Sequence, residues 1–177
     1  MEERIKIPEG NSVEILNGTI TVKGKYGKVE RKFNPYFINI YVENNEIVLK
    51  TKKDKRRDKA LLYTMVAHIK NMFHGVNDKI IYKLKLVYSH FPVSLEVKGN
   101  ELLIKNFLGE KVPRRAKILD GVSCKISGKD IILEGVDIEK VSQTAANMEI
   151  ATKVTKRDRR VFQDGIYITE KDGVPIV

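Results

Sequence analysis

The sequence predicts an α+β protein in which one small fold occurs twice in tandem. Two observations carry this prediction. Alternating apolar residues mark strands, and the same order of segments recurs at a nearly constant offset. Val13 and Leu95 occupy matching places 82 positions apart, and Glu46 and Asp130 lie 84 positions apart. Because solenoids repeat every ~20–50 residues, we expect instead two tandem copies of one small domain, each with strands followed by one helix.

The first copy is expected over residues 1–80. Apolar residues alternate on both sides of Asn17-Gly18, a dipeptide typical of a two-residue hairpin turn. A second hairpin is expected over 38–49, with its turn at 43–45. A helix then follows, because apolar residues recur at spacings near three and four, and Gly75 is placed to end it in a left-handed turn. The apolar stripe of this helix consists of Leu61, Leu62, Met65, Ile69, Met72 and Phe73.

The second copy is expected over residues 81–177 and repeats this order. Hairpins are predicted around Gly99-Asn100 and Ser127-Gly128, and Asp137 is a credible N-cap for the second helix. The alternation in 78–92 favours a strand over a loose linker. The apolar side of the second helix is expected to carry Val141, Ala145, Met148 and either Ala151 or Thr152.

The composition favours a polyanion as the partner. The chain has 33 Lys and Arg against 23 Asp and Glu, giving a net charge of +10. Residues 1–90 carry 18 basic and 10 acidic groups, whereas 91–177 carry 15 and 13. A basic soluble protein with no such partner is the alternative. With 42% hydrophobic and 32% charged residues, the chain is expected to fold and not to be disordered.

Three clusters concentrate the positive charge: Lys52–Lys59, Lys111–Lys117 and Lys153–Arg160. In the third, five cations and one acid run directly into Phe162 and Tyr167, and aromatic rings beside cations suit RNA, whose bases stack. A solvated face is the alternative for each cluster, and a place in the core is the alternative for the two rings. Lys23–Lys28, with two glycines, is a weaker phosphate-binding signal.

Several function classes are disfavoured. Cys124 is the single cysteine, so no intramolecular disulfide forms, and its alternating strand position predicts a small packed residue. His68, His74 and His90 lack metal-ligand spacing, and no nucleophile or tuned acid pair emerges. We find no apolar run long enough to span a membrane and no signal peptide. A cytoplasmic, non-enzymatic protein without cofactor, metal or small-molecule substrate is expected.

The motifs NFLGEKVPRR, SGKDIILEGVDIE, VSQTAAN and FQDGIYI closely resemble the archaeal and eukaryotic branch of the large-subunit ribosomal protein six family. The resemblance covers essentially the whole chain and is strongest in its second half. It implies a duplicated α+β fold in which each copy has small antiparallel sheets and one helix around a single core. A protein of this kind is expected to bind large-subunit rRNA near the stalk base and the sarcin-ricin loop, beside neighbouring ribosomal proteins. It also implies that the second copy and its C-terminal tail make much of the RNA contact.

Carried over by position, two motifs supply all the candidate RNA-binding residues except Lys153, which comes from the third basic cluster. The bacterial branch has a different tail, so its contacts are not transferred. The basic residues are Lys111, Arg114, Arg115, Lys117, Lys153, Lys156, Arg157, Arg159 and Arg160, and Phe162, Gly165 and Tyr167 accompany them.

Two other function classes stay open at this point. An enzyme acting on nucleic acid would need a metal or general-base cluster that the scattered acids do not supply. A protein-interaction module would use the same basic faces against acidic partners, such as the acidic proteins of the ribosomal stalk.

Overall fold

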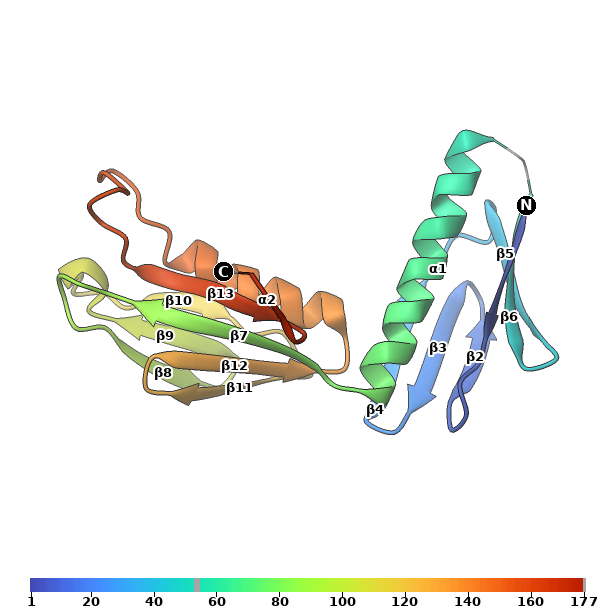
Figure 1. Ribbon diagram of the computed structural model, residues 1–177, viewed down its shortest axis with the longest axis horizontal. Helices are drawn as coiled ribbons and strands as arrows, with labels where there is room; N and C mark the ends of the chain where they lie inside the picture. Colours follow the sequence, from blue (N-terminus) through green and yellow to red (C-terminus); the bar gives the residue numbers. More distant parts are fainter. Residues whose placement is uncertain (53–54, 177) are drawn as a thin grey trace. The chain divides into compact units, whose positions relative to one another are not determined.

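The structure is a computed structural model that describes residues 1–52 and 55–176 (Figure 1). The chain divides into two compact units, Met1–Lys79 and Ile80–Val177. Each unit contains antiparallel sheets and one long helix. The predicted α+β class with an internal duplication is therefore confirmed.

The first unit holds two three-stranded sheets and α1 (Arg56–Asn77). One sheet has the order β1-β6-β5, formed by Glu2–Lys6, Glu46–Thr51 and Ile38–Glu43. The other has the order β2-β3-β4, formed by Ser12–Leu16, Thr19–Gly24 and Gly27–Lys32. All the pairings are antiparallel, and α1 contacts strands of both sheets.

Both predicted hairpins of the first unit are present. The first has the predicted two-residue turn at Asn17-Gly18, and the second has a two-residue turn at Asn44-Asn45, since Glu43 pairs with Glu46. Asn17 and Gly18 have φ of 46° and 76°, and Asn44 and Asn45 have φ of 48° and 62°. Two consecutive residues with positive φ form a type I′ turn, whose twist matches that of the flanking strands. Asparagine tolerates this conformation better than most residues, which explains its use at three of the four positions.

Helix α1 follows the predicted stripe but ends later than predicted. Leu62 and Ile69 are fully buried, whereas Leu61 is only half-buried. Gly75 does not end the helix, which continues to Asn77. The reason is tertiary: Val76 is fully buried, and its carbonyl accepts the Tyr26 N–H at 3.0 Å, so packing holds one more turn in place.

The second unit repeats the order of the first. The order β11-β12-β7 corresponds to β5-β6-β1, β8-β9-β10 corresponds to β2-β3-β4, and α2 corresponds to α1. The strands are β7 (Ile80–Val87), β8 (Ser94–Lys98), β9 (Glu101–Lys105), β10 (Arg114–Lys117), β11 (Val122–Ser127) and β12 (Asp130–Gly135). The helix is α2 (Ile138–Ala151), and a short 3-10 turn, η1, covers Phe107–Gly109.

One extension distinguishes the second unit. β13 (Gly165–Lys171) pairs antiparallel with β7, and β14 (Val174–Pro175) pairs with β13, so that the sheet has five strands. Figure 1 shows β13 lying along α2. The segment expected to be an RNA-binding tail is therefore in part an ordinary strand. Sequence reasoning also missed the short strands β1, β4 and β10, whose many charged residues obscure the alternation.

The predicted elements of the second core are confirmed. The Asp137 side chain accepts the Glu139 N–H at 3.0 Å, as an N-cap does. Val141, Ala145 and Met148 are fully buried against strands of the unit. Cys124 is half-buried at the edge of this core, and burial raises the pKa of its thiol to about 11. The thiol therefore stays protonated at neutral pH and is a packing group.

No helix in the described part of the chain is long and apolar enough to cross a membrane.

We expect Phe107→Ala to destabilise the second unit by about 3–5 kcal/mol, because this ring is fully buried in the core and its loss leaves a cavity. Urea denaturation measures the effect. Phe91→Ala is the control, since its ring is 39% exposed and should cost much less. Equal losses for the two variants would contradict this account of the core.

Candidate nucleic-acid interface

The candidate site is built around the C-terminal end of α2. Thr152, which follows the helix and is 2% exposed, donates its hydroxyl to the Met148 and Glu149 carbonyls at 3.1 and 3.2 Å. The same oxygen accepts the Ile166 N–H at 2.9 Å. One step further, the Glu149 carboxylate accepts the Ile168 N–H at 2.8 Å. Thr152 and Glu149 thus satisfy two N–H groups near the start of β13, on the edge that does not face β7.

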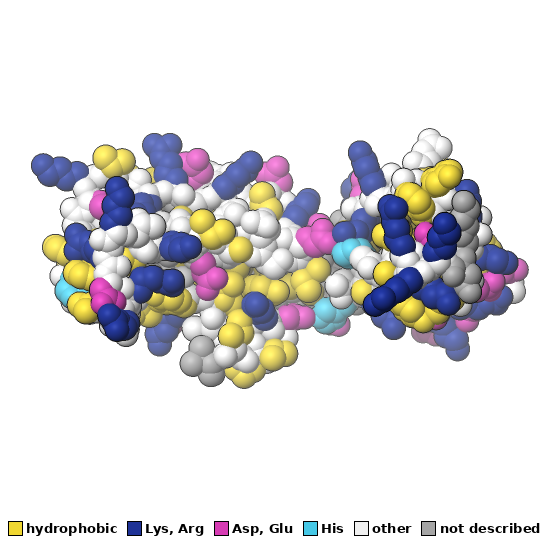
Figure 2. Space-filling model, turned by 90° about the horizontal axis from the view of Figure 1, so that it is seen from above, with side chains coloured by type: hydrophobic (Ala, Val, Ile, Leu, Met, Phe, Trp, Pro, Cys, Tyr) yellow, Lys and Arg dark blue, Asp and Glu magenta, His cyan; other side chains and the backbone are white. Residues whose placement is uncertain are grey.

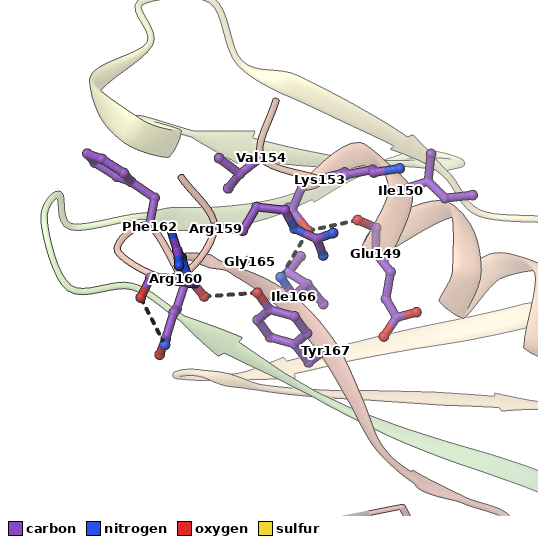
Figure 3. Close-up of a pocket in the computed structure, with 12 residues that line it drawn as sticks. Glu149, Ile150, Lys153, Val154, Arg159, Arg160, Phe162, Gly165, Ile166 and Tyr167 are labelled. Carbon is purple, nitrogen blue, oxygen red and sulfur yellow. Dashed lines mark hydrogen bonds between the residues drawn. The ribbon is translucent and has the colours of Figure 1, made fainter. Parts of the chain in front are cut away.

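A groove of about 620 Å³ lies beside this junction (Figure 3). The loop from α2 to β13 contributes much of its lining, and β13 contributes Tyr167 (Figure 3). The groove brings together six of the predicted RNA-binding residues: Lys153, Arg159, Arg160, Phe162, Gly165 and Tyr167. The other lining residues are Glu149, Ile150, Thr152, Val154, Gln163 and Ile166, none of which was predicted.

The loop cations differ in how they are held. Arg160 donates from Nη2 and Nε to Asp158 at 2.8 and 3.1 Å, yet its side chain is 90% exposed. This charged hydrogen bond lowers the pKa of the Asp158 carboxyl. Lys156 has φ of 62°, which places a left-handed turn in the loop. Lys153, Arg157 and Arg159 are exposed.

Phe162 is packed and is not a free stacking platform. Its ring stacks on His90 with centroids 4.7 Å apart and an interplanar angle of 28°. The Arg157 guanidinium lies 4.6 Å from the centroid of the same ring. Cation–π contact of this kind positions the guanidinium while leaving its N–H groups able to donate in the plane. Phe162 therefore acts as a support for Arg157.

The far end of the loop is anchored by Asp164, which is 1% exposed. Its Oδ1 accepts the Ser89 backbone N–H at 3.2 Å and the Ser89 hydroxyl at 3.1 Å. His90 Nδ1 lies 3.6 Å from the same oxygen and 2.9 Å from the Ser89 hydroxyl. Asp164 and Phe162 together tie the loop to the segment that follows β7.

Gly165 and Tyr167 form one packing arrangement. A Cβ on Gly165 would lie 3.2 Å from two ring carbons and the hydroxyl oxygen of Tyr167, so this side chain needs a glycine next to it. The Tyr167 hydroxyl donates to the Gln163 carbonyl at 3.0 Å, and the side chain remains 43% exposed. Gly165 is itself buried, so it contributes little exposed surface to the groove that it lines. Tyr167 is thus an oriented, accessible ring in the wall of the groove.

Arg114 mainly stabilises the fold. It donates to both oxygens of Glu110 at 2.6 and 2.8 Å, and from Nη1 to the carbonyls of Ala151 and Lys153 at 3.0 and 3.1 Å. Its guanidinium also lies 4.4 Å from the centroid of the buried Phe107 ring. The Arg114 hydrogen bond holds the pKa of the Glu110 carboxyl below its usual range. Most donors of Arg114 are therefore used inside the protein.

The other residues of the second cluster are more accessible. Lys111 is exposed in the turn before β10, and Arg115 and Lys117 are exposed on that strand. Arg115 lies 3.7 Å from Glu101, with 68% of its side chain exposed. The strand alternates, since Ala116 between them is 2% exposed in the core. None of these three residues lines the groove.

Part of the first cluster, Lys53 and Asp54, lies outside the described residues, while Lys52, Lys55, Arg56 and Arg57 are exposed. In the Lys23–Lys28 segment, Lys25 lies 5.1 Å from the Tyr26 ring centroid. Figure 2 shows Lys and Arg side chains protruding from both units, with acidic side chains between them.

Sequence reasoning missed the residues that are not basic but hold the groove in place through hydrogen bonds. Thr152 and Glu149 accept backbone N–H groups of β13, which lie 14 and 19 residues further along the chain. Asp164 accepts the backbone N–H of Ser89, 75 residues earlier. His90 was interpreted as a structural or surface residue, and its contacts with Phe162 fit that interpretation. The apolar alternation of Ile166 and Ile168 in FQDGIYI was the one available signal that this segment is a strand.

A duplicated fold with a basic, aromatic-lined groove is the kind of surface that nucleic-acid-binding proteins use. The described residues contain no group of His, Cys, Asp and Glu that could hold a metal ion. The sequence profile of the family described as Ribosomal protein L6 matches residues 7–79 and 91–165, one match in each unit. The chain belongs to the ribosomal protein L6 family, as its motifs predicted. The family is structural and not enzymatic, as expected.

Curated relatives agree over nearly the whole length. The chain is 52% identical over 173 residues to large ribosomal subunit protein uL6 of Sulfurisphaera tokodaii, covering 97% of this chain and 93% of the relative. It is 47% identical over 173 residues to the protein of the same name from Aeropyrum pernix, covering 97% and 95%. For the Saccharolobus solfataricus protein of that name the identity is 46% over 175 residues, covering 98% and 97%.

We expect Glu110→Gln to lower stability at pH 7 by less than about 1 kcal/mol, because the Glu110 carboxylate is partly exposed and its ion pair is screened. The Glu110 pKa is lower in the folded state, so this contribution is present above the ordinary pKa and fades as pH falls through the folded value. Urea denaturation of both proteins from pH 7 to pH 3 should therefore show converging stabilities. A difference that grows with acid would contradict the assignment.

We expect Asp164→Ala to loosen the loop without unfolding the unit, since two hydrogen bonds to Ser89 are lost. A buried hydrogen bond left unmade costs about 1–3 kcal/mol, which corresponds to local amide exchange about 5–150 times faster in residues 153–163. Hydrogen-exchange mass spectrometry measures this. Asp164→Asn keeps one acceptor oxygen and should change exchange less; unchanged exchange in the alanine variant would refute the anchor.

Proposed function

We propose that this protein is a structural component of the large ribosomal subunit that binds large-subunit rRNA through the groove beside α2. The observation that carries the proposal is that one groove gathers Lys153, Arg159, Arg160 and the exposed Tyr167 in a chain of this family. The relatives are named as proteins of the large ribosomal subunit, which supports the same role here. The protein then works in the cytoplasmic ribosome and has no catalytic step.

The cations divide into phosphate contacts and supports. Lys153, Lys156, Arg157, Arg159 and Arg160 are exposed on one loop and bind phosphates of the rRNA backbone. Arg114 holds the end of α2 beneath them, and Phe162 orients Arg157. Lys111, Arg115 and Lys117 extend the basic surface outside the groove. Phosphate contacts carry little sequence information, so selectivity comes from RNA shape.

Tyr167 is the residue suited to contact a base. Its hydroxyl donates to the Gln163 carbonyl, and its ring packs closely against Gly165. Because the ring is already held in one orientation, binding a base costs little conformational entropy. A base that stacks on an aromatic side chain contributes about 1–3 kcal/mol. The groove therefore accepts an unpaired or irregular nucleotide among phosphates.

The location within the subunit belongs to the same proposal. Following the resemblance, the rRNA bound is that near the stalk base and the sarcin-ricin loop, with ribosomal proteins of the stalk base as neighbours. Ile150 lines the groove and is 67% exposed, and Val161 in the same loop region is 60% exposed. These two apolar side chains suit contact with a neighbouring protein.

Cross-linking in cells, followed by sequencing of the attached RNA and peptide mapping, tests the location: peptides from 111–117 or 153–171 should carry one region of large-subunit rRNA. Diffuse RNA attachment would contradict it.

We expect the triple variant Arg157→Glu, Arg159→Glu and Arg160→Glu to abolish incorporation into the large subunit while both units stay folded. Each lost phosphate contact also lowers the steepness of log affinity against log salt by about 0.7–0.9. Sucrose-gradient sedimentation of tagged protein and circular dichroism measure the two effects. The matched control reverses Lys98, Lys125 and Lys140, which line no part of the groove, and should incorporate normally. Wild-type incorporation of the first variant would refute the proposal.

A further inference from the structure

The first unit carries positive charge that the proposed function does not use. Residues 1–79 contain 16 Lys and Arg against 10 Asp and Glu, a net of +6, whereas residues 80–177 contain 17 against 13, a net of +4. Every residue assigned to rRNA contact lies in the second unit. The larger surplus therefore points to a further anionic partner for the first unit.

Some of this excess positive charge is concentrated where α1 begins. A depression of about 240 Å³ is lined there by residues from two separate parts of the sequence: Tyr36 and Phe37 before β5, and Lys52, Lys55, Arg57 and Asp58 between β6 and the first turn of α1. In Figure 2, dark-blue basic side chains surround yellow apolar ones at this end of the unit. The depression thus combines aromatic rings and cations, as the groove of the second unit does.

The two rings form a supported platform. Tyr36 is 68% exposed, which is unusual for so large a side chain, and Phe37 packs edge-on against it with centroids 5.1 Å apart at 88°. The Tyr36 N–H donates to the Asn34 side chain at 2.9 Å, which fixes the backbone of the loop. An exposed ring held in this way offers a face for stacking at low entropic cost.

Two basic side chains lie close to these rings. The Lys52 ammonium lies 5.9 Å from the Tyr36 centroid, and the Arg57 guanidinium lies 4.9 Å from the Phe37 centroid. Among the described residues, no acidic side chain forms an ion pair with Lys52, Lys55 or Arg57. Their charges are therefore not neutralised by described acids and can meet phosphates.

One acidic residue also lines the depression. Asp58 is 6% exposed, and a carboxylate there disfavours a phosphate but accepts hydrogen bonds from a base amino group such as that of cytosine. This arrangement favours a base inside the depression and phosphates on the cations around it. An acidic polypeptide fits less well, because its carboxylates would meet Asp58 and would not need the rings.

We propose that the depression formed by Tyr36, Phe37, Lys52, Lys55, Arg57 and Asp58 is a second binding site for single-stranded RNA, in which a base stacks on Tyr36. This site extends the protein's RNA contact to the first unit and is independent of the groove beside α2. Stacking on aromatic residues and phosphate contacts together are the usual basis of single-strand binding.

The test uses the full chain with Arg157, Arg159 and Arg160 reversed to glutamate, so that the groove in the second unit is disabled. Fluorescence anisotropy with a 12-nucleotide oligocytidylate should detect salt-dependent binding. Tyr36→Ala in this background should weaken it about tenfold. Lys52→Gln and Arg57→Gln should each lower the steepness of the salt dependence by about 0.7.

Tyr63→Ala is the matched control, because this tyrosine is 52% exposed on α1 but does not line the depression. It should change the affinity less than twofold. An absence of binding in the background protein, or equal effects of the two tyrosine variants, would overturn the proposal. A polyglutamate peptide that binds more tightly than the RNA and is equally sensitive to Tyr36→Ala would overturn it in favour of an acidic polypeptide.

The outcome is separable from that of the proposed function. Normal behaviour of Tyr36→Ala in RNA binding, with failure of the triple arginine variant to enter the subunit, would remove only the second site. Oligocytidylate binding that depends on Tyr36, with normal incorporation of the triple variant, would support the second site and contradict the rRNA assignment of the groove.

Discussion

The C-terminal end of α2 is the point on which the second unit depends. A helix leaves its last four carbonyls without intrahelical partners, and burying them unpaired is costly. Here Thr152 and Arg114 supply donors from two directions, one from the chain that follows the helix and one from β10. Because Thr152 also accepts from β13, the helix end, the sheet edge and the loop that carries the cations are fixed by one set of hydrogen bonds.

This arrangement explains why not all basic residues of the candidate interface have the same role. A guanidinium has donors in a fixed planar fork, and those of Arg114 are directed to Glu110 and to the helix carbonyls. The exposed Arg159 and Arg160 lie on the loop that Arg114 and Asp164 hold at its two ends. Positive charge on a loop is effective against a structured anion only when the loop is preorganised, and the buried contacts provide that.

The duplication shows how one fold acquires two different surfaces. Both units have the same strand order around one helix, but only the second adds β13 and β14 to the edge strand. That addition creates the groove, since the loop leading into β13 lines it. In the first unit the aromatic and basic residues gather instead at the beginning of α1, in the segments next to β5 and β6. Equivalent cores thus leave different parts of the surface free to diverge.

The sequence by itself determined the duplication, the hairpins of the first unit and the helix stripes, because these depend on residue periodicity and on φ preferences that act locally. It also determined the family, through motifs in the second half. Only the tertiary structure decided that α1 passes Gly75, that Arg114 is held inside the protein and that Phe162 supports Arg157. The first two outcomes depend on partners far along the chain, such as Tyr26 for Val76 and Ala151 for Arg114, and no local pattern specifies which donor meets which acceptor across such separations. The third depends on the distant His90, on which the Phe162 ring stacks beside Arg157.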